Sequence, residues 1–154
     1  MDLSSILKPS AVKMVSETSS KKRLFQRLGE IAEAAYGLDG QEAVDALLER
    51  ESLGPTGVGS GIALPHARLS STGDIYGVFF RLERPIDFDS VDRQPVDLVF
   101  ALFAPEDSGV NHLKALALIS RTMRNPSVCA KLRANSSATT LHAVLTEAQS
   151  PQAA

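Results

Sequence analysis

The chain has 154 residues, a length that predicts one domain built around one hydrophobic core. Hydrophobic residues make up 44% of the composition and charged residues 22%, a balance typical of soluble globular proteins rather than disordered or fibrous ones. The 16 basic and 18 acidic residues leave a net charge of -2, which argues against a protein that binds DNA or RNA.

Two amphipathic helices are predicted in the first third of the chain. Apolar residues recur at helical spacing over residues 20–36, where either serine at 19–20 can cap the helix and Gly37 can end it. A second helix is predicted to begin at the cap Asp39 and to end before Gly54. Its buried side chains are expected to be Val44, Leu47 and Leu48.

Short apolar runs that begin at Ile62 predict strands in the middle of the chain. Ile75–Leu82 alternates as a strand does, and Pro85 is expected to limit its extension. Val96–Ala104 is apolar on both faces after its second residue, so we expect it to lie centrally in a sheet, beneath helices.

The last third returns to helical spacing. Three helices are predicted: one buries Leu113, Leu116, Ala117 and Met123, a short one spans Val128–Leu132, and one buries Leu141, Val144 and Leu145 behind Ser136 or Ser137 as cap. Helices followed by strands and again by helices predict a layered α/β or α+β fold. Residues 1–154 are expected to form a single domain, with a disordered tail at about 150–154.

Neither a disulfide nor a membrane span is expected. The single cysteine, Cys129, cannot form an intramolecular disulfide, so the fold does not depend on an oxidising compartment, and the cytoplasm is favoured. The longest apolar run extends only from Leu98 to Ala104, whereas a helix needs roughly 20 residues to cross a bilayer. Direct insertion into a membrane is therefore not expected.

Glycine is concentrated in one segment, Gly54–Gly61. Glycines permit positive φ and allow backbone N–H groups to approach an anion closely, so a phosphate site is one interpretation. The segment is neither a P-loop, because no Gly-Lys-[Ser/Thr] follows, nor a dinucleotide fingerprint, because the spacing and the order of elements differ. A mobile surface connection is the structural alternative. The residues expected to cradle a phosphoryl group are Thr56, Gly57, Gly59, Ser60 and Gly61.

His66 is the strongest candidate for chemistry. Pro65 has a fixed φ and restrains the residue before it, which gives the histidine a stiff support at the end of a short apolar strand. A neutral imidazole is a competent nucleophile near pH 7, so His66 is a candidate acceptor of a phosphoryl group. The alternative is a histidine that only bonds a nearby carbonyl.

Two further residues are candidates for the same site. His112 is expected in the first turn of a helix, where the positive helix end favours a neutral ring that can donate one hydrogen bond to a phosphoryl oxygen; an exposed histidine at a helix start is the alternative. Arg50 is expected in the last turn of the second helix, where its guanidinium can bind a phosphoryl group through two hydrogen bonds. The alternative is a purely structural role, in which its positive charge stabilises the negative end of the helix dipole.

The remaining polar groups are interpreted as structural. His142 is expected on the surface or in helix packing, and Lys21–Arg23 as a solvated helix start. The aspartates at 87–92 do not match a calcium loop, because a valine occupies the third ligand position and the turn glycine is absent. The histidines and the cysteine lack zinc spacing, so no metal and no cofactor are assigned.

Three segments together resemble the mannitol/fructose type of phosphotransferase-system IIA domain: Arg50–His66, Pro85–Leu98 and Asn111–Leu113. The similarity extends over nearly the whole chain and is greatest to the nitrogen-regulatory IIA subfamily. It implies a mixed β-sheet of about five strands covered by helices. By position, it implies that His66 is the phosphorylated histidine, His112 the second active-site histidine and Arg50 the active-site arginine. One departure is Ala67, where nitrogen-regulatory members usually have glycine.

The resemblance also implies partners. The phosphoryl donor would be an HPr-like phosphocarrier protein. If the protein is regulatory, its target proteins would control nitrogen metabolism or potassium uptake. Two other functions stay open: a sugar-specific IIA component that passes the phosphoryl group to a IIB domain, and a non-catalytic anion-binding interaction module.

Overall fold

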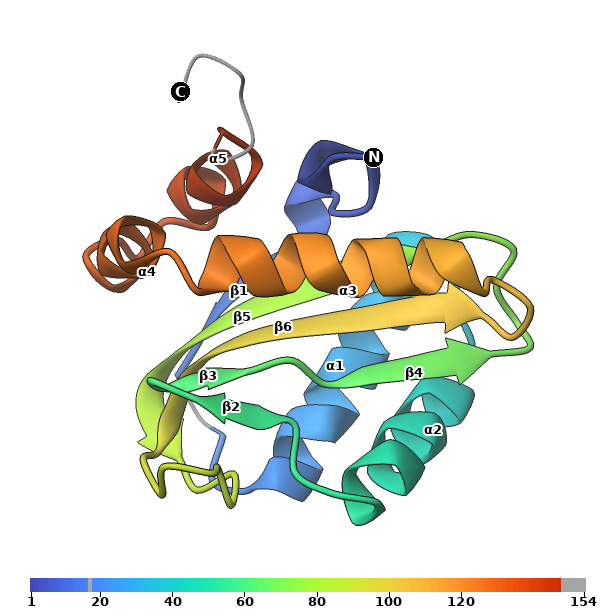
Figure 1. Ribbon diagram of the computed structural model, residues 1–154, viewed down its shortest axis with the longest axis horizontal. Coiled ribbons are helices and arrows are strands. Elements are labelled where there is room, and N and C mark those ends of the chain that lie inside the picture. The colour runs from blue at the N-terminus through green and yellow to red at the C-terminus, as the bar shows by residue number, and fades with distance from the viewer. Residues whose placement is uncertain (17, 148–154) are drawn as a thin grey trace.

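A computed structural model describes residues 1–16 and 18–147. The tail that the sequence predicts to be disordered lies outside the described residues. Six strands form one mixed sheet: β1 (Val12–Val15), β2 (Gly57–Gly59), β3 (Ile62–Ala63), β4 (His66–Leu69), β5 (Tyr76–Ile86) and β6 (Val96–Pro105). The sheet order is β1-β5-β6-β3-β2, and β4 continues beyond β3 along β6 (Figure 1). The mixed sheet is confirmed, with six strands instead of about five.

Strand directions explain how the sheet is mixed. β5 and β6 are antiparallel neighbours, and β2 and β3 form an antiparallel hairpin. β1 pairs in parallel with β5, while β3 and β4 both pair in parallel with β6. Because β3 and β4 follow each other along the same edge of β6, the segment between them stays close to the sheet, where the Pro65 carbonyl accepts from the Leu102 N–H at 3.0 Å.

Five α-helices are present in the described residues: α1 (Lys21–Tyr36), α2 (Gly40–Ser52), α3 (Val110–Met123), α4 (Pro126–Arg133) and α5 (Ala138–Glu147). Short 3-10 turns, η1 (Leu3–Ser5) and η2 (Pro9–Ala11), precede β1. Helices α1 and α3 lie on opposite sides of the sheet, and α2 packs beside α1 against β4 (Figure 1). None of the helices in the described part of the chain is long and apolar enough to cross a membrane. The single-domain α+β fold is confirmed.

The first two helices begin and end at the residues that the sequence indicates. The Ser20 side chain accepts from the Arg23 N–H at 3.2 Å, and Gly37 ends α1 with a φ of 72°. Asp39 caps α2 by accepting from two N–H groups, each at 3.1 Å. These are local interactions between residues close in sequence, which is why the helix boundaries are readable from the sequence.

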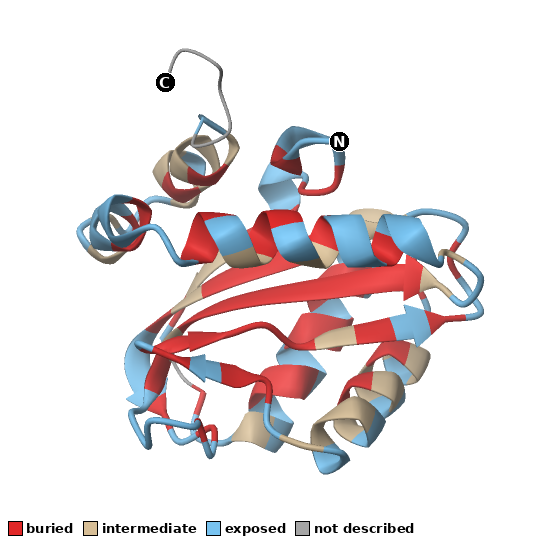
Figure 2. Cartoon of the chain, in the orientation of Figure 1, coloured by how far each residue is buried: buried red, intermediate tan, exposed pale blue. Residues whose placement is uncertain are grey.

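The centre of the sheet is β6, as its apolar run predicts. All of its residues are buried except the half-buried Asp97 and Pro105 (Figure 2). Phe100 on β6 faces its cross-strand partner Phe79 on β5, with ring centroids 6.0 Å apart in an edge-to-face contact. Covering helices on both sides explain the absence of a polar face.

The strand predicted over Ile75–Leu82, with Pro85 limiting its extension, runs further than expected, because β5 includes Pro85 and ends one residue after it, at Ile86. β1 pairs with β5 only as far as Leu82, so within residues 1–16 and 18–147 no strand pairs with that side of the proline. On the other side the register with β6 shifts between Arg81 and Ile86. Proline is tolerated at such an edge irregularity, because its missing N–H has no ladder partner to lose.

The buried face of α3 also differs from the prediction. Leu113 is 63% exposed and Ala117 is exposed, while Leu116 is half-buried. The helix instead packs through His112, Ala115, Leu118, Ile119, Thr122 and Met123. Leu113 and Leu116 line a pocket that opens between α3 and α2, which explains why Leu113 is exposed and why Leu116, although packed against the core, is only half-buried.

Candidate functional site

A pocket of about 540 Å³ lies where α2, β4 and the start of α3 meet. It is lined by Arg50 from the last turn of α2, His66 from the first position of β4 and His112 from the first turn of α3. The structure therefore brings together the three residues that the sequence selects from positions far apart in the chain. Ala67, the departure from the usual subfamily pattern, lines the same pocket.

The contacts of His66 define the protonation of its ring. Nδ1 lies 2.9 Å from the Leu64 carbonyl oxygen, which can only accept a hydrogen bond, so Nδ1 carries the proton. Nε2 lies 3.4 Å from Nε of Arg50, which can only donate, so Nε2 presents its lone pair. The two contacts agree on a neutral ring with an unprotonated Nε2 in the pocket.

The surroundings of His66 favour this neutral state. Burial lowers the pKa of His66 below the ordinary 6.5, and the nearby Arg50 guanidinium lowers it further. The hydrogen bond to Leu64 and the negative charge of Glu51 oppose the shift without reversing it. Near neutral pH the ring is therefore available as a nucleophile.

His112 is only 5% exposed, so it is not the exposed helix-start histidine that was the alternative. Its Nδ1 accepts from Nε of Arg68 at 3.0 Å. Its ring stands edge-on to that of His66, with centroids 5.8 Å apart. Burial, Arg68 and His66 lower the pKa of His112, so the expected neutral ring is favoured by neighbours as well as by the helix end.

The Arg50 guanidinium lies between the end of α2 and His66. Its Nη1 donates to the Gly54 carbonyl at 2.9 Å, while its Nε approaches Nε2 of His66. The first contact closes the loop after the helix, and the second places positive charge beside the unprotonated ring nitrogen. In this one conformation, Arg50 therefore both stabilises the end of α2 and lies where it could bind a phosphoryl group on His66.

Arg68 also lines the pocket, although it was not predicted from the sequence. It follows His66 by two residues on β4, so both side chains lie on the same face of the strand. The alternation of side chains along a strand could have placed Arg68 beside His66. The sequence does not indicate, however, that a strand begins at His66.

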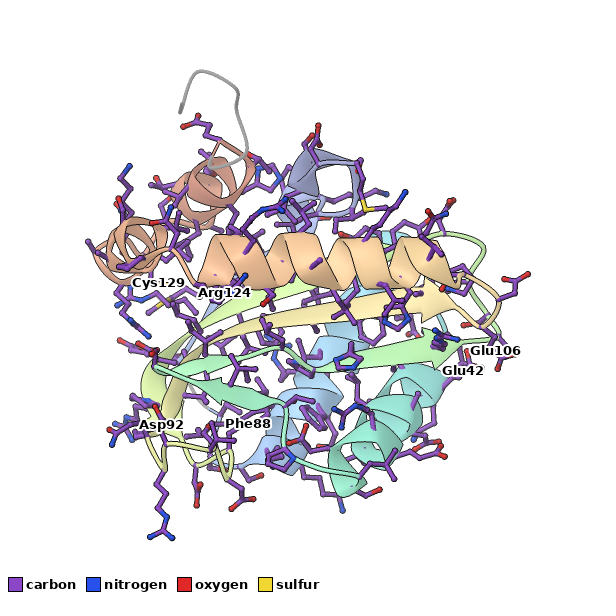
Figure 3. The ribbon with its side chains drawn as sticks, viewed as in Figure 1. Glu42, Phe88, Asp92, Glu106, Arg124 and Cys129 are labelled. Atoms are coloured by element: carbon purple, nitrogen blue, oxygen red, sulfur yellow. The ribbon has the colours of Figure 1, made fainter. Side chains whose placement is uncertain are left out.

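The glycine segment forms the β2–β3 hairpin, and none of its five predicted cradle residues lines the pocket. The Ser60 N–H donates to Asp92 at 2.9 Å, and its carbonyl accepts from Arg133 at 2.8 Å. Arg68, in contrast, reaches the carbonyl of Glu106. Figure 3 shows Asp92 and Glu106 at opposite ends of the sheet, so the hairpin turn points away from the His66–His112 pair.

Packing and turn geometry account for the glycines of this hairpin. A Cβ on Gly57 would lie 2.2 Å from Oγ of Ser90, and Gly61 has a φ of 80° that favours glycine. Thr56, before the hairpin, is buried and donates through its hydroxyl to Glu51 at 2.6 Å. The Thr56 carbonyl accepts from the Leu64 N–H at 2.9 Å. This hydrogen bond joins the start of the hairpin to the residues just before His66.

The sequence predicts that Lys21 is a solvated residue at a helix start, but its side chain makes specific contacts. Its Nζ lies 2.9 Å from Oε2 of Glu51, whose side chain is 7% exposed, and 4.8 Å from the Phe88 ring centroid. The same Glu51 carboxylate accepts from both the N–H and the hydroxyl of Thr56. The lysine therefore helps to fix the segment that leads into β2.

The other polar candidates remain structural. Nε2 of His142 lies 2.9 Å from the Leu7 carbonyl oxygen and joins α5 to the N-terminal turns. In residues 1–16 and 18–147 no group of three or more His, Cys, Asp or Glu side chains is arranged to hold a metal ion.

Comparisons with known proteins identify the family. The profile of the family described as "Phosphoenolpyruvate-dependent sugar phosphotransferase system, EIIA 2" matches residues 5–148. The chain is 44% identical over 145 residues to the "Nitrogen regulatory protein" of Bradyrhizobium diazoefficiens, covering 94% of this chain and 95% of that protein. It is 34% identical over 147 residues to the "PTS system fructose-specific EIIA component" of Haloferax volcanii, covering 95% and 96% respectively.

A solved structure agrees with the sequence relatives. The chain superposes on the nitrogen regulatory protein IIA-Ntr from Neisseria meningitidis with a TM-score of 0.85 and 36% identity, covering 92% of this chain and 97% of that one. Because the profile, the relatives and the fold all extend over nearly the whole chain, the resemblance read from the sequence is confirmed: the chain belongs to the EIIA 2 family of the phosphoenolpyruvate-dependent sugar phosphotransferase system.

Proposed function

We propose that this protein is a regulatory IIA protein of a nitrogen-related phosphotransferase system, which accepts a phosphoryl group on His66 from an HPr-like phosphocarrier and signals its phosphorylation state to target proteins. The supporting observation is the state of the His66 ring, whose Nδ1 is held by Leu64 and whose Nε2 presents a lone pair in the pocket. Membership of the family and the nitrogen regulatory relatives support the regulatory assignment.

The proposed reaction is an in-line displacement at phosphorus. Nε2 of His66 forms a bond to phosphorus while the bond to the donor atom breaks, and the donor leaves with that electron pair. The Nδ1 proton stays in its hydrogen bond to the Leu64 carbonyl. Positioning and charge stabilisation supply the catalysis, so the proposal includes no nucleotide, metal or other cofactor.

Arg50 and His112 are proposed to stabilise the transferred group. Arg50 already brings a guanidinium beside Nε2 of His66, where negative phosphoryl oxygens would gather. His112 is buried next to His66, and its own Nε2 has no hydrogen-bond partner in the described part of the chain. In the neutral ring that nitrogen is an N–H donor available to a phosphoryl oxygen.

The reaction is tested by phosphate incorporation from the phosphorylated donor protein in excess chelator. Wild type should be labelled, His66→Ala should not, and His142→Gln should serve as the control, since His142 lies on α5 outside the pocket. His112→Ala and Arg50→Lys should slow labelling without abolishing it. Full labelling of His66→Ala would refute the assignment, and an unlabelled wild type would favour the non-catalytic anion-binding module.

The sugar-transport function is a second candidate, because a fructose-specific EIIA component is 34% identical to this chain. Phosphorylation adds roughly -1.5 to -2 charges at one site, which can create or abolish a docking contact without refolding the domain. Capture from cell extract should therefore be compared for wild type, His66→Ala and His66→Asp. Partners that distinguish the two variants favour regulation, including control of nitrogen metabolism or potassium uptake. Efficient transfer to a IIB domain, with sugar uptake lost on deletion, favours transport.

A further inference from the structure

The guanidinium of Arg68 is held on two sides at the edge of the pocket. Its Nε donates to Nδ1 of His112 at 3.0 Å, and its Nη1 donates to the Glu106 carbonyl at 3.4 Å. The first contact joins β4 to the first turn of α3, and the second joins β4 to the loop before α3. Arg68 thus contacts the ring of the second histidine directly.

This contact determines which nitrogen of His112 carries the proton. A guanidinium has only donors, so Nδ1 of His112 must accept and cannot be protonated while the contact exists. The proton of the neutral ring is then on Nε2. That atom is buried and has no partner among the described residues. An unpaired buried donor is costly because it gives up its hydrogen bond to water, so its presence next to His66 points to a group that pairs with it in another state of the protein.

The charged and titratable groups around the pocket favour a neutral His112. Glu49 and Arg50 line it from α2, and His66 and Arg68 line it from β4. No hydrogen bond between a carboxylate and His112 is found in residues 1–16 and 18–147, and Arg68 already occupies Nδ1. A cationic ring would direct a second N–H at the guanidinium, so the neutral Nε2–H form is the one that fits the contact.

We propose that Arg68 is a positioning residue: by donating to Nδ1 of His112 it assigns the proton to Nε2, and so makes His112 a hydrogen-bond donor to the phosphoryl group on His66. The use of this donor rests on the proposed function. The assignment of the proton does not, because it follows from the contact in the unphosphorylated chain. The two histidines consequently hold opposite tautomers, with a lone pair on Nε2 of His66 and a proton on Nε2 of His112.

Imidazole nitrogen NMR spectra and transfer rates test the proposal together. In wild type, His112 should show the Nε2–H form. Arg68→Leu should shift the ring toward the Nδ1–H form and slow phosphoryl transfer by roughly 10²-fold, the loss that follows removal of one donor to developing charge. Arg68→Gln, whose amide can still donate to Nδ1, should restore part of both properties. Arg121→Leu removes the same charge from an exposed position of α3 outside the pocket and should change neither.

The outcomes separate this proposal from the proposed function. An unchanged His112 tautomer in Arg68→Leu overturns the assignment; if transfer nevertheless slows, Arg68 binds the phosphoryl group itself. A shifted tautomer with wild-type transfer also overturns it. Absence of labelling in wild type refutes the proposed function, while the NMR spectra still test the contribution of Arg68 to the protonation of His112. Backbone amide spectra of each variant establish that it is folded.

Discussion

At the scale of single residues, the chemistry of each histidine depends on what its partner can do. A carbonyl that only accepts holds Nδ1 of His66, whereas a guanidinium that only donates holds Nδ1 of His112. The same side chain therefore becomes a nucleophile candidate in one position and a donor in the other. Both rings are kept neutral by burial and by neighbouring positive groups.

The lowered pKa values predict how stability depends on pH. Since the folded-state pKa values of His66 and His112 lie below the unfolded value of about 6.5, the unfolded chain binds more protons as the pH falls through 6.5. The free energy of unfolding contributed by these groups is thus fully present above about pH 6.5 and is lost as the pH falls toward the folded pKa values. Histidine NMR titration and urea unfolding at several pH values measure this.

The double variant His66→Gln/His112→Gln should lose that part of the pH dependence, whereas His142→Gln should retain it. Titration of both pocket histidines at or above pH 6.5 in the folded protein would contradict the prediction. These experiments need no phosphoryl donor, so they test the electrostatics of the pocket separately from its function.

At the scale of elements, the contact between α1 and α2 places Arg50. The two helices cross closely at Gly29, where a Cβ would lie 2.5 Å from Cγ2 of Val44 and 2.7 Å from the carbonyl oxygen of Gly40. The second of these atoms belongs to the backbone and cannot move aside as a side-chain end can. The position of α2 against β4, and hence of Arg50 against His66, depends on this approach.

Gly29→Ala should therefore destabilise the protein, although helix propensity alone would favour alanine by about 1 kcal/mol. Overpacking typically costs about 1–3 kcal/mol, so a net loss of up to roughly 2 kcal/mol in the free energy of unfolding is expected. Gly73→Ala is the control, since its Cβ would meet nothing within 4 Å. Urea denaturation measures both variants. A Gly29→Ala protein as stable as wild type would show that the helices separate at little cost.

At the scale of the whole molecule, one core connects both ends of the described chain. Leu145 on α5 and Phe25 on α1 are fully buried in the same contiguous cluster of apolar residues. Tyr36 on α1 stacks on Tyr76 of β5, and its hydroxyl donates to the Gly77 carbonyl at 2.7 Å. Burial raises the pKa of Tyr36 to about 12, so this tyrosine stays protonated well above neutral pH.

Leu145→Ala should lower the stability of the whole domain by about 2–5 kcal/mol, because it leaves a cavity in the shared core. The urea midpoint should fall with an unchanged m-value, and transitions followed by far-UV circular dichroism and by tyrosine fluorescence should coincide. The tyrosine pair reports on α1 and β5, far in sequence from the substitution. Separate transitions for the two probes would mean that α5 unfolds independently.

Features that rest on short-range interactions or on strong composition could be predicted from the sequence alone. The caps at Ser20, Gly37 and Asp39 bond groups within a few residues, and the apolar run of β6 can only be buried on both faces. The family followed from motifs along the chain and is confirmed. The grouping of Arg50, His66 and His112 was a hypothesis from their chemistry that the resemblance supported, since spacing alone does not bring them together.

Contacts between distant segments could not be predicted in this way, because they depend on the folded arrangement of the strands and helices. The Arg68–His112 bond joins residues 44 positions apart, and it requires the parallel register of β4 with β6 together with the start of α3. The same dependence on packing partly buries the Lys21–Glu51 pair and turns the glycine hairpin toward Arg133 instead of the pocket. Short-range signals are set by the backbone of a few neighbouring residues, whereas these contacts exist only once the strand register and helix packing have formed.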